Sequence, residues 1–295
     1  MLEHGQASRV EPPRVVVLGA TGFVGATIEA RLAADGMAVL GLGSRHLDLL
    51  AADAAEGLAS LLQPTDALVF VSALTPDRGR DASTFVKNLT MGERVCVALA
   101  VRGVAHVVYL GSDAVYADGA SLVDESTPCH PSSLHGCMHL GREVMLTTSV
   151  KTPLAILRPS LLYGEGDTHN GYGPNRFRRL AARGERIVLF GEGEERRDHV
   201  LVDDVAELVR LCILHRSRGV LNIATGHSAS FREVAELAVA NFPDPAAIAG
   251  SPRATPITHR HFDITQTIQA FPGFSYTPLA AGLQLVHGRA MEQDR

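Results

Sequence analysis

The stretch that decides the fold is residues 15–25, VVVLGATGFVG, in which four apolar residues run directly into a turn with three glycines. A short, uninterrupted apolar run predicts a strand buried on both faces. The glycines let the turn close, let the backbone approach a pyrophosphate, and let the helix predicted over residues 26–34 pack near the strand. That helix would offer free N–H groups and the positive end of its dipole to phosphates. The pattern therefore favours a dinucleotide site over an ordinary strand–turn–helix, with these contact residues: Gly19, Thr21, Gly22, Phe23, Val24 and Gly25.

The composition limits the possible functions. The 295 residues suit one large α/β domain or a domain with an annex, and the 46% apolar content supports a sizeable core. A net charge of −5 provides no basic surface for nucleic acid. No apolar run approaches the ~18 residues of a membrane span, and the first dozen residues, expected to form a frayed tail, lack the apolar stretch of a signal peptide. The four scattered cysteines are typical of reduced thiols in a cytoplasmic protein.

The second predicted strand, residues 38–42, bears on the choice of cofactor because it ends in Gly43-Ser44-Arg45. In a dinucleotide-binding fold, an acidic residue at this point accepts hydrogen bonds from the adenosine ribose and selects NAD. Arg45, with Ser44 beside it, instead suits a 2′-phosphate, because a guanidinium binds phosphate as a fork. We therefore expect NADP, with NAD as the alternative; a solvated arginine at a loop tip is the simpler explanation of Arg45.

Strands and helices alternate through most of the chain. Further strands are predicted at residues 67–71, 104–110 and 154–159, with helices at 51–62, 82–102 and 134–150 between them. This alternation predicts an α/β fold with a Rossmann-like, doubly wound parallel sheet. After Tyr163 the sequence becomes rich in glycine, proline, asparagine and aspartate, which indicates loops and shorter elements.

The change after Tyr163 indicates a division into two parts. We expect a dinucleotide-binding domain over residues 14–163, completed by residues 198–225, and a small C-terminal substrate-binding annex over residues 164–197 and 226–295; residues 1–13 are the tail. The later elements are predicted as a helix at 177–183, a strand at 187–190, a helix capped by Asp203 or Asp204, a strand at 220–223, a helix at 231–241, a linker at 243–256 and a helix at 278–291.

Several of these stretches, in this order, resemble the extended short-chain dehydrogenase/reductase family of NAD(P)-dependent sugar-nucleotide epimerases, dehydratases and reductases. The resemblance covers roughly residues 14–240. Besides the glycine-rich turn it rests on Asp48-Leu49, Asn88, Gly111-Ser112-Asp113-Ala114-Val115-Tyr116, Leu157-Arg158-Pro159 before Tyr163-Gly164, Arg197-Asp198-His199-Val200 before Val202-Asp203-Asp204, and Asn222-Ile223-Ala224-Thr225-Gly226. The close spacing of Arg45 and Asp48 is similar to the shorter members that reduce 4-keto sugar nucleotides.

The resemblance implies roles for individual residues. Asp48 and Leu49 would face the adenine, and Ala73 would line the cofactor. Asn88 would be a buried amide that ties a helix to a strand.

On the substrate side, the resemblance implies that Ser112 hydrogen-bonds the reacting sugar oxygen with Asp113 beside it; a cap at the strand end is the structural alternative for Ser112. Arg197 would hold the substrate pyrophosphate, unless it is occupied by an ion pair with Asp198 or Glu195. Two weaker candidates for substrate contact are Asn175 and Arg176.

The sequence departs from this family at its catalytic helix, which carries a tyrosine and, four residues later, a lysine. In the family the tyrosine exchanges a proton with the substrate, and the lysine holds the nicotinamide ribose and lowers the pKa of the tyrosine. Here residues 133–143, SLHGCMHLGRE, place His135 at the tyrosine position and His139 at the lysine position. The two histidines are one helical turn apart and should share a face.

Several interpretations of the histidine pair are open. In the first, His135 is the general acid/base, since an imidazole pKa of ~6.5 suits proton transfer near neutrality, and His139 bonds the cofactor ribose. In the second, redox chemistry is lost and the protein binds a nucleotide as a regulatory or scaffold protein. In the third, the pair binds a metal with Cys137 or His130. The structural alternative is two ordinary polar helix residues; we expect no metal.

We therefore expect an NAD(P)-dependent epimerase or ketoreductase that acts on a nucleotide-diphosphate sugar. Dehydratase chemistry is disfavoured because elimination needs both an acid and a base, and Asp113 is followed by Ala114 rather than by a glutamate. The alternative is a non-catalytic NAD(P)-binding protein of the same fold. Because family members often dimerise through their two long helices, the resemblance also implies a homodimer; we expect no nucleic acid or membrane partner.

Overall fold

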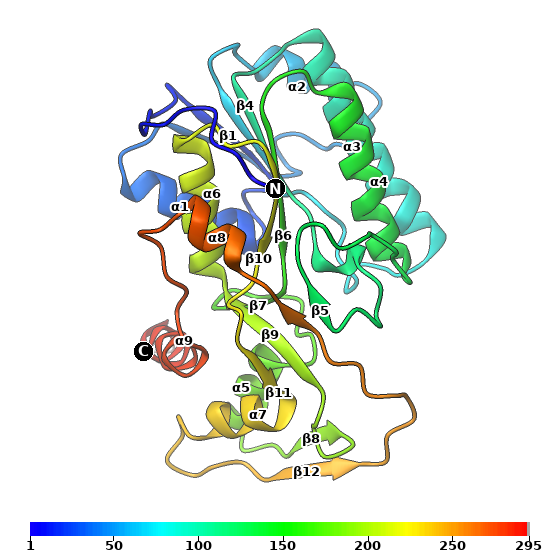
Figure 1. The fold of residues 1–295 in the computed structure, drawn as a ribbon, viewed down its shortest axis with the longest axis vertical. Coiled ribbons are helices and arrows are strands. Elements are labelled where there is room, and N and C mark those ends of the chain that lie inside the picture. The colour runs from blue at the N-terminus through cyan, green and yellow to red at the C-terminus, as the bar shows by residue number, and fades with distance from the viewer. Residues whose placement is uncertain (294–295) are drawn as a thin grey trace.

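A parallel sheet of six strands forms the centre of the protein (Figure 1). The structure is a computed structural model, and it describes residues 1–293. The strands follow the order β10-β6-β4-β3-β1-β2, and every neighbouring pair is parallel. Their bounds are β1 Val15–Leu18, β2 Val39–Leu42, β3 Ala67–Phe70, β4 His106–Leu110, β6 Leu154–Pro159 and β10 Gly219–Ile223. This sheet confirms the predicted α/β, doubly wound, Rossmann-like fold.

Strand β1 is buried on both faces because it lies between β2 and β3 and helices cover the sheet on each side. Its side chains alternate between two cores, as the period of a strand requires. Val15 and Val17 contact the core under α1 and α6, whereas Val16 and Leu18 contact the core under α2, α3 and α4. The uninterrupted apolar run in the sequence thus reflects two buried faces rather than one.

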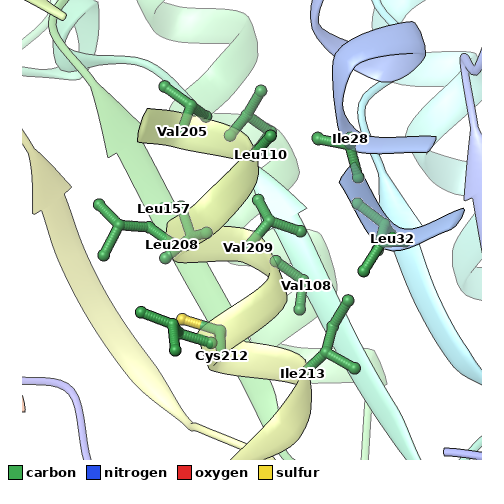
Figure 2. Close-up of a cluster of buried hydrophobic side chains, with 14 of the residues drawn as sticks. Ile28, Leu32, Val108, Leu110, Leu157, Val205, Leu208, Val209, Cys212 and Ile213 are labelled. Carbon is green, nitrogen blue, oxygen red and sulfur yellow. The ribbon is translucent and has the colours of Figure 1, made fainter. Parts of the chain in front are cut away.

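Five helices form the two outer layers (Figure 1). Their bounds are α1 Phe23–Ala34, α2 Ala54–Leu61, α3 Ala82–Val101, α4 Leu134–Ser149 and α6 Val202–Leu214. Figure 2 shows Val209 of α6 facing Val108 of β4 and Ile28 of α1, whereas Leu208 lies beside Leu157 of β6 on the other side of the helix. Each strand and helix predicted up to residue 241 forms, with ends that differ by a few residues.

Smaller elements lie beyond the carboxyl edge of the central sheet (Figure 1). Strands β7 Leu161–Tyr163, β9 Arg196–Leu201 and β11 Ser228–Ser230 form one sheet, with β9 in the middle. Helices α5 Pro174–Ala182 and α7 Phe231–Val239 pack around a separate core that includes Phe177 and Phe231. The remaining elements are β5 Leu122–Val123, β8 Ile187–Phe190, β12 Ile248–Ser251, β13 His261–Phe262, α8 Thr265–Ala270 and α9 Leu279–Gln293.

Three expectations about this periphery are wrong. The predicted linker contains β12, which pairs in parallel with β8. The predicted frayed tail is attached to the segment between α6 and β10: Leu2 is buried, Glu3 forms a bridge with Arg218, and backbone hydrogen bonds continue to Val10. Neither Asp203 nor Asp204 caps α6, whose N-cap residue is Leu201.

The two aspartates instead hold the C-terminal region. Asp204 accepts hydrogen bonds from the backbone nitrogen and hydroxyl of Thr277, at 2.8 and 2.9 Å, and Asp203 pairs with Arg289 at 2.9 Å. Before Thr277, the segment with α8 packs against β10 of the central sheet, and Phe271 joins the core under α6. Within residues 1–293, every helix is too short or too polar to cross a bilayer.

Candidate active site

The turn between β1 and α1 forms the floor of a groove at the carboxyl edge of the sheet. Gly19 has a φ of +94°, a conformation that favours glycine, and a Cβ there would lie 2.8 Å from the backbone nitrogen of Ser72. A Cβ at Gly25 would lie 2.0 Å from the carbonyl oxygen of Gly19. The chain can make this turn, and bring α1 this close to β1, only with glycine at both positions.

The N-terminus of α1 opens into this groove. Gly22 is its N-cap residue and no side chain caps the helix, so the N–H groups of the first turn remain available to an anion. The groove has a volume of about 430 Å³. Most of the predicted cofactor-binding residues line it: Gly19, Thr21, Gly22, Phe23, Val24, Gly25, Ser44, Asp48, Leu49 and Ala73. The residues present therefore fit a dinucleotide.

Two predicted cofactor-binding residues do not line this groove. Arg45 is exposed beside Ser44, in the loop after β2, and has no ion pair within the described part of the chain. His139 is buried in α4. Asp48, at the rim, accepts a hydrogen bond from the backbone nitrogen of Leu50 at 3.0 Å, which holds the loop that carries Leu49.

A second cavity, of about 310 Å³, adjoins the groove, and Leu74 and His169 line both. His135, in the first turn of α4, lines this cavity together with Arg80 from the segment before α3. His169 Nδ1 lies 2.9 Å from Asp77 Oδ1, so that the loop after β7 is joined to the loop after β3. The predicted acid/base His135 thus lies beside the cofactor groove rather than inside it.

The start of α4 is fixed tightly. The hydroxyl oxygen of Ser133 accepts a hydrogen bond from the Gly136 backbone nitrogen at 3.1 Å and caps the helix. A Cβ at Gly136 would lie 2.1 Å from the carbonyl oxygen of Ala114, so the helix approaches the segment after β4 more closely than any other residue would allow. These contacts set the position of His135, which is adjacent to this glycine.

The rings of His135 and His139 lie edge to face, 4.6 Å apart between their centroids, which confirms that they share a helix face. Burial, together with positive charge on His169, Arg142 and Arg80, lowers the pKa of His135 to about 4. Burial, His135 and Arg142 also hold the pKa of His139 well below its usual range. Both rings are therefore neutral at neutral pH.

Asn88 of α3 has the role predicted for it. Its Oδ1 accepts a hydrogen bond from the Leu74 backbone nitrogen at 2.8 Å, and its Nδ2 donates to the Leu74 carbonyl at 2.9 Å. This paired contact fixes the residues after β3 that line both cavities.

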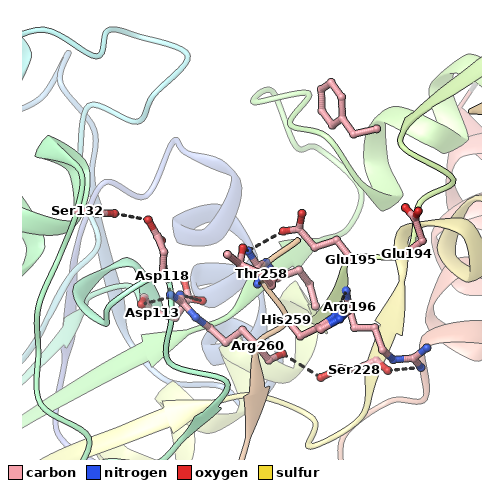
Figure 3. Close-up of polar contacts among 12 residues, drawn as sticks. Asp113, Asp118, Ser132, Glu194, Glu195, Arg196, Ser228, Thr258, His259 and Arg260 are labelled. Carbon is pink, nitrogen blue, oxygen red and sulfur yellow. Dashed lines mark hydrogen bonds and ion pairs between the residues drawn. The ribbon is translucent and has the colours of Figure 1, made fainter. Parts of the chain in front are cut away.

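On the substrate side, Ser112 and Asp113 follow β4. The hydroxyl oxygen of Ser112 accepts a hydrogen bond from the backbone nitrogen of Ala114 at 3.1 Å, which is the strand-end cap considered as its structural alternative. Burial raises the pKa of Asp113, while the Arg260 guanidinium, 3.1 Å from its carboxylate, opposes this shift (Figure 3). Arg260 is itself buried and also donates to the Ala117 carbonyl at 2.9 Å. Asp113 is thus held by an arginine from the C-terminal region.

Arg197 on β9 is paired within the protein. Its guanidinium lies 2.6 Å from Glu195 Oε1 and donates to the Thr258 hydroxyl at 2.9 Å. Figure 3 shows Thr258 beside Glu195. Glu195 also pairs with Arg253 at 3.1 Å. The ion-pair alternative for Arg197 is therefore realised with Glu195, whereas Asp198 accepts hydrogen bonds from Ser160 and Thr225 instead.

The weaker substrate candidates lie on α5. Asn175 Oδ1 accepts a hydrogen bond from Gly164 at 3.0 Å, and its Nδ2 donates to Asp167 at 2.9 Å. The amide holds the loop after β7, and its contact with the substrate stays a prediction. Arg176 is exposed, and neither residue lines the two cavities described above.

Sequence reasoning missed several residues around the histidine pair. The structure adds Tyr109, Arg142, Arg80 and His169 to this region. Tyr109 lies within an apolar strand and Arg142 within a helix, and neither belongs to a recognisable motif. The only signal was compositional: a tyrosine among valines in β4 and an arginine on the buried face of α4.

No group of three or more His, Cys, Asp or Glu side chains that could hold a metal ion occurs among the described residues. The histidine pair therefore has no third ligand from Cys137 or His130 here. All four cysteines are free.

Comparison with known proteins supports a family assignment. Residues 15–224 match the model of the NAD dependent epimerase/dehydratase family. The chain is 25% identical to a dTDP-L-rhamnose 4-epimerase of Burkholderia thailandensis, over 89% of this chain and 90% of that protein. It is 29% identical to a dTDP-6-deoxy-L-talose 4-dehydrogenase (NAD(P)(+)) of Kitasatospora kifunensis, over 83% of this chain and 84% of that protein.

Among solved structures, MoeE5 in complex with UDP-glucose and NAD has the same fold. Its TM-score is 0.83 at 24% identity, with 96% of this chain and 100% of that chain covered. The family model spans more than half of the chain and includes the glycine-rich turn, the histidine pair and Arg197. The chain belongs to the NAD-dependent epimerase/dehydratase family.

Proposed function

We propose that the protein is an NAD(P)-dependent epimerase or ketoreductase of a nucleotide-diphosphate sugar, with His135 as its proton-transfer group. The observation that carries this proposal is the position of His135. It lines a cavity that shares Leu74 and His169 with the groove whose floor is the glycine-rich turn. A 4-epimerase and a 4-dehydrogenase of sugar nucleotides among its relatives support the substrate class.

The cofactor would be held by the groove and would supply or accept the hydride. The uncapped first turn of α1 would bind its diphosphate, and Asp48 with Leu49 would contact the adenosine. We propose NADP over NAD because Ser44 and Arg45 are exposed beyond β2, where a 2′-phosphate would lie, and no carboxylate neutralises Arg45 within the described residues.

His135 would accept a proton from a sugar hydroxyl at a ring nitrogen. With a pKa of about 4 the ring is unprotonated and available as an acceptor at neutral pH, but it is a weaker base than the imidazole of pKa ~6.5 expected from the sequence. The hydroxyl proton would therefore move to the ring as the hydride leaves the same carbon. The same burial makes the protonated ring a strong acid, which returns the proton readily. His139 would bond the cofactor ribose as a neutral donor, because two charged rings 4.6 Å apart would repel each other.

Arg197 would bind the substrate diphosphate by exchanging its carboxylate partner. Its guanidinium already pairs with Glu195 at 2.6 Å, and the phosphate oxygens would take the place of this carboxylate. Asp113, held by Arg260, would shape the sugar end of the site beside Ser112, whose hydroxyl would donate to a sugar oxygen in place of the Asp113 carboxylate.

The test is a turnover assay on purified protein with UDP-, dTDP- and GDP-linked sugars and with NADP or NAD. An epimerase recycles its cofactor, so the assay must follow both the absorbance of the reduced nicotinamide and the chromatographic separation of sugar epimers. We expect conversion of at least one nucleotide sugar and none of the free sugar. If cofactor binds but no sugar nucleotide is converted or bound, the proposal fails.

The second candidate is a non-catalytic NAD(P)-binding protein. It is favoured by the burial of His139, which is bonded to Tyr109, and by the use of the Ser112 oxygen as a cap. Cofactor binding that leaves every sugar nucleotide unchanged, yet alters affinity for another macromolecule, would support it.

We also propose a homodimer through the outer face of α3 and α4. Apolar side chains on this face are exposed in the single chain: Val86, Val97, Val101 and Val144. Sedimentation of the wild type and of a Val97→Glu variant tests this, with a shift to monomer expected for the variant.

A further inference from the structure

Below His135, the structure buries a second set of polar groups that the proposed reaction does not use. The hydroxyl oxygen of Tyr109, on β4, lies 2.8 Å from His139 Nδ1. The Arg142 guanidinium, one turn further along α4, places its positive charge near the same hydroxyl. Tyr109 and Arg142 are each 0% exposed. The three side chains therefore form one buried polar cluster, in which Tyr109 is hydrogen-bonded to His139 and Arg142 supplies the positive charge.

The chemistry of these groups decides which atom donates in the hydrogen bond between Tyr109 and His139. His139 Nδ1 is the only hydrogen-bond partner of the Tyr109 hydroxyl within residues 1–293. A buried hydroxyl needs an acceptor for its hydrogen, and the nearby Arg142 guanidinium offers none, so the hydroxyl donates to Nδ1. Burial raises the pKa of Tyr109, so the hydroxyl keeps this hydrogen at all ordinary pH values. His139 Nδ1 is then an acceptor, and the single hydrogen of the neutral ring lies on Nε2.

Arg142 is unusual because its charge has no carboxylate partner among residues 1–293. It donates to the carbonyl oxygens of Ser72 and Asn88, at 2.7 and 2.8 Å, and it lies over the Phe70 ring. A buried charge without a counter-ion is costly, and most are paired.

The neighbouring Arg158 shows the ordinary arrangement. Its guanidinium is bidentate to Glu143, at 2.6 and 3.0 Å, and it also donates to the hydroxyl of Tyr116 at 2.8 Å. The molecule thus contains two buried arginine–tyrosine pairs. Only the pair that touches the histidines keeps its positive charge unneutralised.

We propose that Tyr109 and Arg142 are positioning residues that lock His139 as the neutral Nε2–H tautomer, so that it presents a hydrogen-bond donor to the bound cofactor. Nε2 has no hydrogen-bond partner within the described residues, which leaves its hydrogen for a ligand. The assignment of that donor to the cofactor rests on the proposed function. The tautomer itself does not, and it can be measured without turnover.

In this arrangement two residues supply what a single lysine would supply. A lysine at the position of His139 would supply both a hydrogen-bond donor and a fixed positive charge. Here His139 supplies the donor and Arg142 supplies the charge. The other charged or titratable groups that face His139 and Arg142 are His135 on the same helix and Arg80, Asp81 and His169 around the cavity.

The direct test is nitrogen NMR of the imidazole rings in full-length, ¹⁵N-labelled protein, with the His139 signals identified by their loss in His139→Gln. We expect His139 to be an Nε2–H tautomer that does not titrate between about pH 5.5 and about pH 8. Tyr109→Phe removes only the hydroxyl, and we expect it to shift His139 to a mixture of tautomers. If His139 keeps the pure Nε2–H form in Tyr109→Phe, or carries its hydrogen on Nδ1 in the wild type, the proposal is overturned.

Tyr116→Phe is the matched control. It removes an equally buried hydroxyl, which donates to Asn222 at 2.7 Å, from the neighbouring arginine–tyrosine pair. The His139 spectrum should be unchanged in this variant, and a change there would mean that any loss of a buried hydroxyl disturbs the helix.

Arg142 is tested by two substitutions in the same spectra. Arg142→Lys keeps a charged donor and should preserve the tautomer, whereas Arg142→Met should lose it and raise the pKa of His139. Equal His139 nitrogen spectra for these two variants would overturn the proposal that the positive charge of Arg142 holds the His139 tautomer.

Cofactor binding separates this inference from the proposed function. In Tyr109→Phe we expect the Kd for the cofactor to rise by roughly tenfold, as for the loss of one good hydrogen bond. A tautomer change with unaltered cofactor affinity would overturn the assignment of the donor to the cofactor. Absence of any turnover in the wild type would contradict the proposed function alone.

Discussion

The glycine-rich turn and the start of α4 meet at the same edge of the sheet, but they form their sites in different ways. The turn offers backbone: N–H groups of an uncapped helix and two glycines that no side chain could replace. The start of α4 offers side chains whose properties depend on burial and on partners from β3, β4 and α3. A backbone site is specified locally and keeps its sequence pattern, whereas a side-chain site can change its chemistry through distant contacts.

The largest expected effect is at the turn. Gly25→Ala places a Cβ 2.0 Å from the Gly19 carbonyl oxygen, so α1 must move away from β1. We expect loss of cofactor binding and a fall in unfolding free energy of several kcal/mol, measured by calorimetric titration and urea denaturation. Gly103→Ala, where no atom lies within 4 Å, is the control. Normal cofactor affinity in Gly25→Ala would show that the turn is not the binding floor.

The next effect concerns the side-chain site for the substrate. Arg197→Glu reverses the charge next to Glu195, and we expect affinity for nucleotide-diphosphate sugars to fall on the order of 100-fold or more, with cofactor affinity kept. Arg196→Glu is the matched control, since Arg196 pairs with Glu233 at 3.1 Å instead. If both variants lose the same affinity for the nucleotide sugar, the effect is general repulsion between the added carboxylate and the diphosphate, and Arg197 is not the anchor.

A smaller effect is expected at the outer end of the cofactor groove. Arg45→Ala should weaken NADP by about 1.5–3 kcal/mol, the contribution of a hydrogen bond to a charged group, and leave NAD almost unchanged. Arg183→Ala, an exposed arginine of α5's C-terminal end, should affect neither. Tighter binding of NAD than of NADP by the wild type would contradict the choice of NADP.

A further effect is on stability, and it follows from histidines whose pKa is lowered in the folded protein. Burial lowers the pKa of His106, His135 and His199 to about 4, below the ~6.5 of the unfolded chain. Between these values the unfolded state binds protons that the folded state does not. The unfolding free energy should therefore decrease as pH falls from about 6.5 to about 4, by about 1.4 kcal/mol per pH unit for each histidine.

His199→Phe tests this prediction with little other disturbance. Neither ring nitrogen of His199 has a hydrogen-bond partner, and its ring contacts Phe231. Urea titrations at several pH values should give a shallower pH dependence for this variant. The same slope as in the wild type would show that His199 is not buried in its neutral form.

The sequence was sufficient for the fold and for the cofactor groove, because both depend on local patterns. Gly19, Gly25 and Leu49, which the sequence assigns to the cofactor, line one groove, and their contact with the cofactor stays a prediction. The partners of the histidines were beyond prediction, since Tyr109 is thirty residues from His139 in the chain and joins it only when β4 and α4 pack together. The commitment of Asn175 to Asp167 was likewise invisible, because a loop contact of this kind has no periodic signal.

The measurement that tests the central claim most directly is single-turnover hydride transfer in the wild type and in His135→Phe, with cofactor saturation confirmed separately. Phenylalanine keeps the ring volume but cannot carry a proton, so we predict a rate lower by about 10²–10⁴ with unchanged cofactor affinity. His130→Phe, which replaces an exposed histidine before α4, should retain the wild-type rate. Hydride transfer by His135→Phe at the wild-type rate would contradict the account, because the proton would then be carried by another group.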